Sequence, residues 1–151
     1  SGLDETRRAL QALRATPLED LGLGQALQHL ARNVAERGGL GLQLDILDRI
    51  PDLSPEVEQC FYRVGQEALD NVAKHADAQR IAVSLREDGG RLILMVSDDG
   101  VGFATDAVAS EYRFGLQGMR ERADLIGATL DIESSPGQGT VVRLQKEIAA
   151  L

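Results

Sequence analysis

The chain has 151 residues and a mass of 16.3 kDa, and 43% of its residues are apolar. A chain of this size buries one respectable core, so we predict one domain. The net charge is −8 with a pI near 4.7, and the 14 arginines and two lysines form no basic block, which argues against nucleic-acid binding. No apolar run reaches the roughly 18 residues of a membrane span, so we expect this fragment to be soluble and to make no membrane contact itself, although its parent protein need not be. The single cysteine, Cys60, excludes an internal disulfide and a thiolate metal site.

The first half of the chain predicts two helices, a strand and a long third helix. Ser1 and Gly2 resemble a remnant of tag cleavage, so we expect the natural chain to begin further upstream. Helical composition spans residues 3–14 and 25–39, and residues 40–47 alternate as in a strand. Ser54 and Pro55 supply an N-cap and a first-turn proline for the longest helix, 55–76. Its apolar stripe makes it the expected spine of the core: Val57, Cys60, Phe61, Val64, Ala68 and Val72.

The second half predicts two hairpins separated by a loop and a helix. Strands at 80–88 and 91–98 are joined by Asp88-Gly89-Gly90, a strong hairpin signal. Residues 99–114 show little periodicity, which predicts a long mobile loop of the kind that covers binding sites. A helix follows from 115, and two more strands are expected at 128–134 and 139–147. The order predicts an α+β fold with a mixed sheet and helices on one face.

Polar side chains line one flank of the helix 55–76. Glu67, Asn71 and Lys74 are spaced by four and three residues, so they should project from nearly the same side. A solvated helix flank would look the same. The functional alternative is that Glu67 orients or deprotonates an attacking group, Asn71 binds Mg²⁺ and Lys74 meets phosphate charge. His75 falls on the apolar stripe, where packing and capping of carbonyls compete with a phosphate contact.

The end of the strand 91–98 carries a second candidate group. If period two persists, Asp98 shares the buried face of the strand, and a buried carboxylate needs a donor such as a ligand amino group. Gly100 and Gly102 would let the backbone approach that ligand. An ordinary Asp-Gly turn is the alternative, and one Gly-x-Gly is weak support by itself.

Two further glycine-bearing segments complete the candidate set. Gly115-Leu116-Gln117-Gly118-Met119 should open a helix, whose N-terminal amides suit an anion such as a triphosphate, although a structural role fits equally. Gly139 precedes Thr140, whose hydroxyl should face inward by strand parity.

The joint order of these motifs resembles the gyrase, heat-shock-90, histidine-kinase and MutL superfamily of ATPases. The segments GQEALDNVAKHADA, VSDDGVGF and FGLQGMRERADLIGATLDIESSPGQGT are similar to sensor histidine kinases that signal to NarL-type response regulators. The likeness spans about residues 16 to 147. It implies a two-layer α/β sandwich of the Bergerat type, with a mixed, mostly antiparallel sheet, helices on one face and a mobile ATP lid.

The resemblance also implies roles for single residues. Asn71 would be the Mg²⁺ ligand and Glu67 the residue that polarises the attacking group. Asp98 would bind the adenine amino group of ATP, with Thr140 supporting it directly or through water. The remaining nucleotide-binding residues would be Lys74, His75, Gly100, Gly102, Gly115, Leu116, Gly118 and Met119.

Two features depart from the family pattern. Asp99 stands where Asn is frequent, and an extra charge there could alter the lid or a magnesium contact. The family's phosphoacceptor is a histidine followed by an acidic residue, whereas His29 is followed by Leu30 and His75 belongs to the ATP site. We therefore expect residues 1–15 to be a tag remnant and the tail of an upstream dimerisation helix, and residues 16–151 to be the catalytic domain.

The function expected from the resemblance is transfer of the γ-phosphoryl group of ATP to a histidine of an upstream dimerisation domain. The phosphate would then pass to a NarL-type response regulator, and the full-length protein would be a homodimer. A serine kinase that acts on an anti-sigma-factor antagonist is one alternative, and a nucleotide-sensing module without transfer is another. A Rossmann site is disfavoured because Gly100-Val101-Gly102 lacks the third glycine and the immediate helix, and a P-loop motif is absent.

Overall fold

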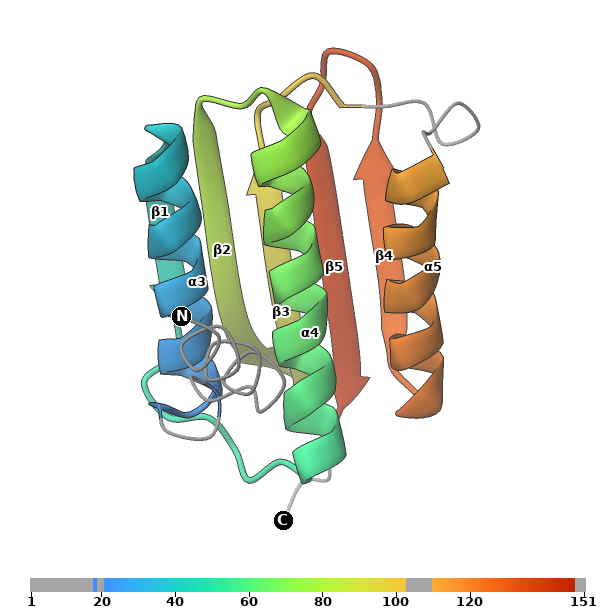
Figure 1. The fold of residues 1–151 in the computed structure, drawn as a ribbon. Coiled ribbons are helices and arrows are strands. Elements are labelled where there is room, and N and C mark those ends of the chain that lie inside the picture. Colours follow the sequence, from blue (N-terminus) through green and yellow to red (C-terminus); the bar gives the residue numbers. More distant parts are fainter. Residues whose placement is uncertain (1–17, 19–20, 103–109, 149–151) are drawn as a thin grey trace, which may run out of the picture.

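The computed structural model describes residues 18, 21–102 and 110–148. Three helices cover one face of a five-stranded sheet (Figure 1). They are α3 (Leu23–Gly38), α4 (Pro55–Asn71) and α5 (Ser110–Leu125), and a π-helical turn, η1 (Val72–Ala76), continues α4. The strands are β1 (Gly41–Ile46), β2 (Arg80–Asp88), β3 (Arg91–Asp98), β4 (Thr129–Ser134) and β5 (Thr140–Glu147).

The sheet has the order β1-β2-β3-β5-β4. Only β1 and β2 are parallel, and the other three pairings are antiparallel. The predicted α+β fold, with a mixed and mostly antiparallel sheet and helices on one face, is confirmed. The predicted helix at 3–14 and residues 103–109 of the predicted loop lie outside the described residues, while residues 110–114 of that loop belong to α5. No described helix is long and apolar enough to cross a membrane.

Local sequence signals explain where the central elements begin and turn. The Oγ atom of Ser54 accepts a hydrogen bond from the N–H of Val57 at 3.2 Å, so Ser54 caps α4 as predicted. Gly89 and Gly90 both have positive φ angles, which the tight β2–β3 turn requires. Side chains alternate between buried and more exposed positions along β2 and β3, which places one face of each strand against the helices.

The helix α4 lies at the centre of the core. Phe61, Val64 and Ala68 on its predicted stripe are almost fully buried. Cys60 belongs to the same core, and burial raises the pKa of its thiol to about 11, with Arg122 opposing the rise, so it is a packed thiol rather than a nucleophile. Gly65 contributes by lacking a side chain, because a Cβ there would overlap a methyl group of the fully buried Leu27 on α3. The two helices can therefore approach closely.

One predicted helix boundary is wrong, and one predicted helix changes type before it ends. The helix predicted at 55–76 does run to Ala76, but its α-helical pattern stops at Asn71 and the last five residues form the π-turn. The helix α5 begins at Ser110, five residues before Gly115. Ser110 and Glu111 are residue types that favour a helix start, and glycine inside a helix costs only about 1 kcal/mol, so packing readily extends the helix through Gly115.

Candidate nucleotide-binding site

The predicted site residues gather at one edge of the sandwich. In Figure 1 the end of α4, the end of β3, the start of β5 and the start of α5 all lie at the upper edge. The register pairs Asp98 with Thr140 across β3 and β5. Segments that are up to 70 residues apart in sequence therefore contribute to one place.

Asp98 is half-buried at the end of β3, as strand parity predicted. Its Oδ1 atom accepts a hydrogen bond from the N–H of Gly100 at 2.8 Å, and the carboxylate also accepts from the N–H of Thr140. Burial raises the pKa of Asp98 above its ordinary value; the N–H of Gly100 opposes this rise, the charge of Asp99 adds to it, and the N–H of Thr140 opposes it. Two donors do not exhaust the roughly four acceptor positions of a carboxylate, so Asp98 can accept further hydrogen bonds.

A backbone cradle surrounds this carboxylate. Gly102 and Gly139 have φ angles of 63° and 75°, a region that favours glycine. A Cβ at Gly102 would overlap the carbonyl oxygen of Ser135, and one at Gly139 would overlap that of Asp98. The N–H of Gly137 also donates to the carbonyl of Val101 at 2.6 Å. The two Gly-x-Gly segments thus pack backbone against backbone, and both need glycine for that contact.

Thr140 is buried, at 7% exposure, and its hydroxyl lies 2.9 Å from the Oγ atom of Ser134. Ser134 in turn donates to the carbonyl of Gly139 at 3.1 Å. When Ser134 gives its proton to Gly139, Thr140 must be the donor to Ser134, so the Thr140 oxygen keeps acceptor capacity. Sequence reasoning missed Ser134; its place opposite Thr140 in the β4–β5 register was the available signal.

Asn71 ends the regular part of α4. Its side chain is 8% exposed, and its Nδ2 atom has no hydrogen-bond partner among the described residues. A buried amide without a partner carries a free-energy cost, which a ligand can relieve. Glu67 lies one α-helical turn earlier and is half-buried. A Cβ on Gly115 would overlap its Oε1 atom, so the glycine lets α5 lie directly over Glu67.

Lys74 does not continue the row formed by Glu67 and Asn71. The π-turn has i→i+5 hydrogen bonds, so residues after Asn71 lose the α-helical spacing on which the prediction rested. Lys74 is exposed; burial raises the pKa of Asp70, and the charge of Lys74 opposes this rise. His75 lies on the same turn, but its side chain is outside the described part of the chain.

The predicted residues of α5 fall into two groups. Met119 is buried in the core, at 1% exposure, and Leu116 packs against that core, which argues against a direct nucleotide contact by the Met119 side chain. The apolar face of α5 is responsible, because Met119 and Ala123 lie one turn apart and are both buried. Gly118 is different, since a Cβ there would meet nothing within 4 Å. Packing in the described structure therefore does not require a glycine at position 118.

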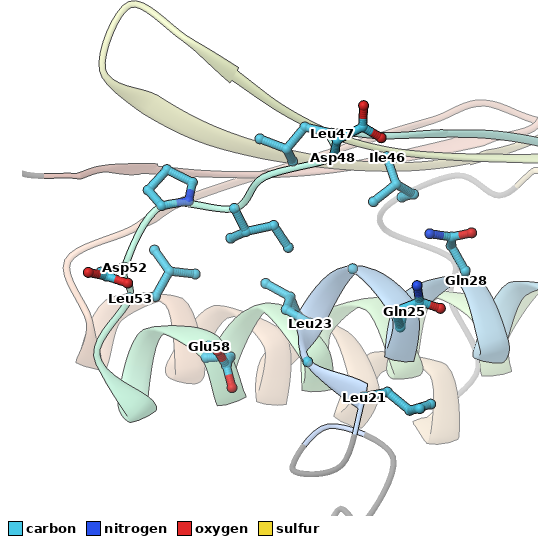
Figure 2. A pocket seen from close by; sticks show the side chains of 14 residues that line it. Leu21, Leu23, Gln25, Gln28, Ile46, Leu47, Asp48, Asp52, Leu53 and Glu58 are labelled. Atoms are coloured by element: carbon cyan, nitrogen blue, oxygen red, sulfur yellow. The ribbon is translucent and has the colours of Figure 1, made fainter.

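A separate pocket of about 420 Å³ lies at the opposite edge, between the start of α3 and the segment that connects β1 to α4 (Figure 2). Asp48, Asp52 and Glu58 line it, and its described lining contains no basic side chain. Three carboxylates disfavour a triphosphate by charge repulsion. The edge that holds Asp98 and Asn71 is acidic as well, through Glu67, Asp98 and Asp99, so it is the candidate nucleotide site because of the unpartnered Nδ2 atom of Asn71 and not because of its charge.

Residues 56–149 match the model of the histidine kinase-, DNA gyrase B- and HSP90-like ATPases. The chain belongs to this family.

Its relatives include sensor histidine kinases. It is 37% identical over 149 residues to the sensor histidine kinase MctS of Rhizobium johnstonii and 34% identical over 146 residues to the oxygen sensor histidine kinase NreB of Staphylococcus carnosus. Each alignment covers 97% of this chain but only 32% and 42% of those proteins, so the chain spans well under half of either relative. The fold resembles the histidine kinase domain of the Erythrobacter litoralis EL346 blue-light activated kinase, with a TM-score of 0.67 over 83% of this chain and 61% of that one, at 22% identity. The chain is thus similar in sequence to sensor histidine kinases and in fold to a histidine kinase domain.

The two neighbouring aspartates should affect the pH dependence of stability in opposite directions. Because the folded-state pKa of Asp98 is raised, its charge lowers stability as the pH rises above the ordinary value of 3.8, and Asp98→Asn should gain stability over wild type in that range. The pKa of Asp99 is lowered by hydrogen bonds from the N–H groups of Arg80 and Gln79. The stabilising contribution of the Asp99 carboxylate is present above pH 3.8 and is lost as the pH falls through its lowered folded-state pKa. Asp99→Asn should therefore be less stable than the wild type near neutral pH. Urea unfolding of the wild type and both variants from about pH 3 to pH 7 measures the change in the free energy of unfolding. A change of the same sign in both variants would contradict this account.

Proposed function

We propose that residues 16–151 form the catalytic domain of a sensor histidine kinase, which binds ATP with Mg²⁺ and transfers the γ-phosphoryl group to a histidine of an upstream dimerisation domain. The observation that carries the proposal is a pair of polar groups at one edge of the sheet. The carboxylate of Asp98 has acceptor positions left, and the buried amide of Asn71 has an unpartnered Nδ2 atom. A ligand that fits both groups carries an amino group for the Asp98 carboxylate at one end and oxygen acceptors for the Asn71 amide at the other. ATP with Mg²⁺ meets both requirements.

Asp98 would hold the adenine by accepting a hydrogen bond from its exocyclic amino group. The chain has only 3% aromatic residues, so such a hydrogen bond rather than aromatic stacking would select the base. Thr140 would accept from a second donor on the base or from a bridging water. The cradle of Gly100, Gly102 and Gly139 would let the base approach the backbone closely.

Asn71 would contribute its side-chain oxygen to Mg²⁺, and its amide nitrogen would then donate to a phosphate or to a metal-bound water. Magnesium commonly takes one or two protein ligands and completes its shell with phosphate oxygens and waters. The bound ion would neutralise charge on the transferred phosphoryl group.

Glu67 would orient the attacking imidazole and accept its proton. The nitrogen of the acceptor histidine would form a bond to the γ-phosphorus while the bond from phosphorus to the β-bridging oxygen breaks, and ADP would leave. His29 is exposed on α3 and is followed by Leu30, which does not fit the acceptor pattern. The acceptor would therefore belong to the dimerisation domain of a homodimeric, cytoplasmic kinase region, and the phosphate would pass on to a NarL-type response regulator.

Asp98→Asn should weaken ATP binding about 100-fold or more, because the amide would place an N–H group against the adenine amino group. Isothermal titration calorimetry measures the affinity, and circular dichroism confirms the fold. Asp88→Asn is a matched control, since Asp88 is exposed at the far end of β2. Unchanged ATP affinity in Asp98→Asn would rule out the adenine contact.

Asn71→Ala should weaken ATP binding about 10- to 100-fold when Mg²⁺ is present, and much less when the ion is chelated. The reason is that the substitution removes a metal ligand but leaves the base contact in place. Calorimetric titrations with and without EDTA separate the metal-dependent part of the affinity from the base contact. An equal loss under both conditions would show that Asn71 does not act through the metal.

Glu67→Gln should retain ATP affinity within about twofold and slow autophosphorylation of the full-length protein at least 100-fold. Glutamine keeps the size of the side chain but cannot accept the proton. Transfer from radiolabelled ATP is the measurement, and calorimetry on the same variant supplies the control. A wild-type full-length protein that binds ATP without any transfer would support the nucleotide-sensing alternative instead.

A further inference from the structure

Asp99 follows the predicted adenine ligand directly, but its carboxylate is engaged elsewhere. Its Oδ1 atom accepts hydrogen bonds from the N–H groups of Gln79 at 2.8 Å and Arg80 at 2.9 Å. The N–H of Asp99 also donates to the carbonyl of Arg80 at 3.3 Å. The side chain therefore bridges the end of β3 to the start of β2, which differs from the expected effect on the lid or on magnesium.

These bonds extend the sheet beyond its last ladder pair. The register between β2 and β3 ends with Asp98 opposite Ile81, and beyond that pair the ties to β2 are the bond from the N–H of Asp99 to Arg80 and the two bonds to the Asp99 carboxylate. On the other side, β5 reaches Asp98 through the N–H of Thr140. Asp98 thus lies between two neighbouring strands, and the carboxylate of Asp99 adds two bonds on the β2 side.

The segment that Asp99 binds is itself fixed. The carbonyl of Gln79 accepts a hydrogen bond from the N–H of Gly41 at 2.9 Å, which ties it to β1. Asp77, two residues earlier, has a φ angle of 47°, an uncommon conformation for a residue with a side chain. Asp99 therefore bonds to a segment with a defined position, at the exit of the π-turn that follows Asn71.

Burial of these residues does not explain the bridge, because Gln79 and Arg80 are both exposed. The effect of the bridge is then to fix the backbone at the end of β3 relative to β2. A single oxygen accepts both bonds, which an asparagine side chain could do as well.

We propose that Asp99 is a positioning residue that aims the carboxylate of Asp98 at the adenine amino group. Its two hydrogen bonds fix the backbone at the end of β3 against β2, so that Asp98 meets the base in one orientation. This inference rests on the proposed function, because it assumes that Asp98 binds adenine. It predicts that Asp99 governs discrimination of the base more than affinity for the phosphates.

The test compares ATP with purine riboside triphosphate, which lacks the exocyclic amino group. Calorimetry on the wild-type chain should show at least about tenfold tighter binding of ATP. Asp99→Ala should weaken ATP about tenfold and the analogue less than about twofold, so that the ratio approaches one. Asp99→Asn should keep the wild-type ratio, since its oxygen can accept the same two bonds, and Asp88→Ala controls for loss of an exposed aspartate.

Each other outcome is informative. An unchanged ratio in Asp99→Ala, or an equal loss for both nucleotides, overturns the positioning role, and so does a collapse of the ratio in Asp99→Asn. A wild-type ratio of one contradicts the adenine contact of Asp98 and with it the proposed function. That failure is visible before any variant is made, so it is distinguishable from a failure of the Asp99 inference.

Discussion

The half-buried carboxylate of Asp98 is the constraint on which the rest of the site depends. A partly desolvated charge must find donors, and here they are two backbone N–H groups, from Gly100 and Thr140. Thr140 can donate only if β5 begins beside the end of β3, which fixes the register of the central strand pair. Gly100 can donate only if the chain folds back directly after β3.

That requirement extends to the glycines around it. The chain after β3 and the turn before β5 must share a small volume, so Gly102 and Gly139 approach neighbouring carbonyl groups more closely than any side chain allows. Their positive φ angles serve the same packing. Glycines that would be assigned to ordinary turns from the sequence are thus parts of one backbone cradle, and the close approach of the two segments explains why both are needed together.

Much of this arrangement was predictable from sequence, because period-two parity follows from strand geometry alone. Parity placed Asp98 and Thr140 on the inner face, and the Asp-Gly-Gly turn and the Ser54 cap gave two boundaries correctly. The π-turn after Asn71 was not predictable, since the apolar stripe continues through Val72 and nothing local marks the change of hydrogen bonding. The early start of α5 and the bridge of Asp99 also escaped prediction. The glycines at 115 and 118 obscured the helix start that Ser110 and Glu111 favour, whereas the bridge depends on a contact with the distant segment at Gln79, which composition does not show.

The acidic charge of the chain bears on how such a site could hold a triphosphate. With a net charge of −8, the long-range field opposes an anion, although salt screens it beyond about 8 Å. The nearby cation Lys74 already interacts with Asp70. In the proposed function, affinity at the phosphate end would then come from Mg²⁺ and from backbone amides, which are neutral donors, while the base contact would supply selectivity. The proposed site would separate its two tasks, with Asp98 recognising the nucleotide and Asn71 holding the ion that neutralises the charge to be transferred.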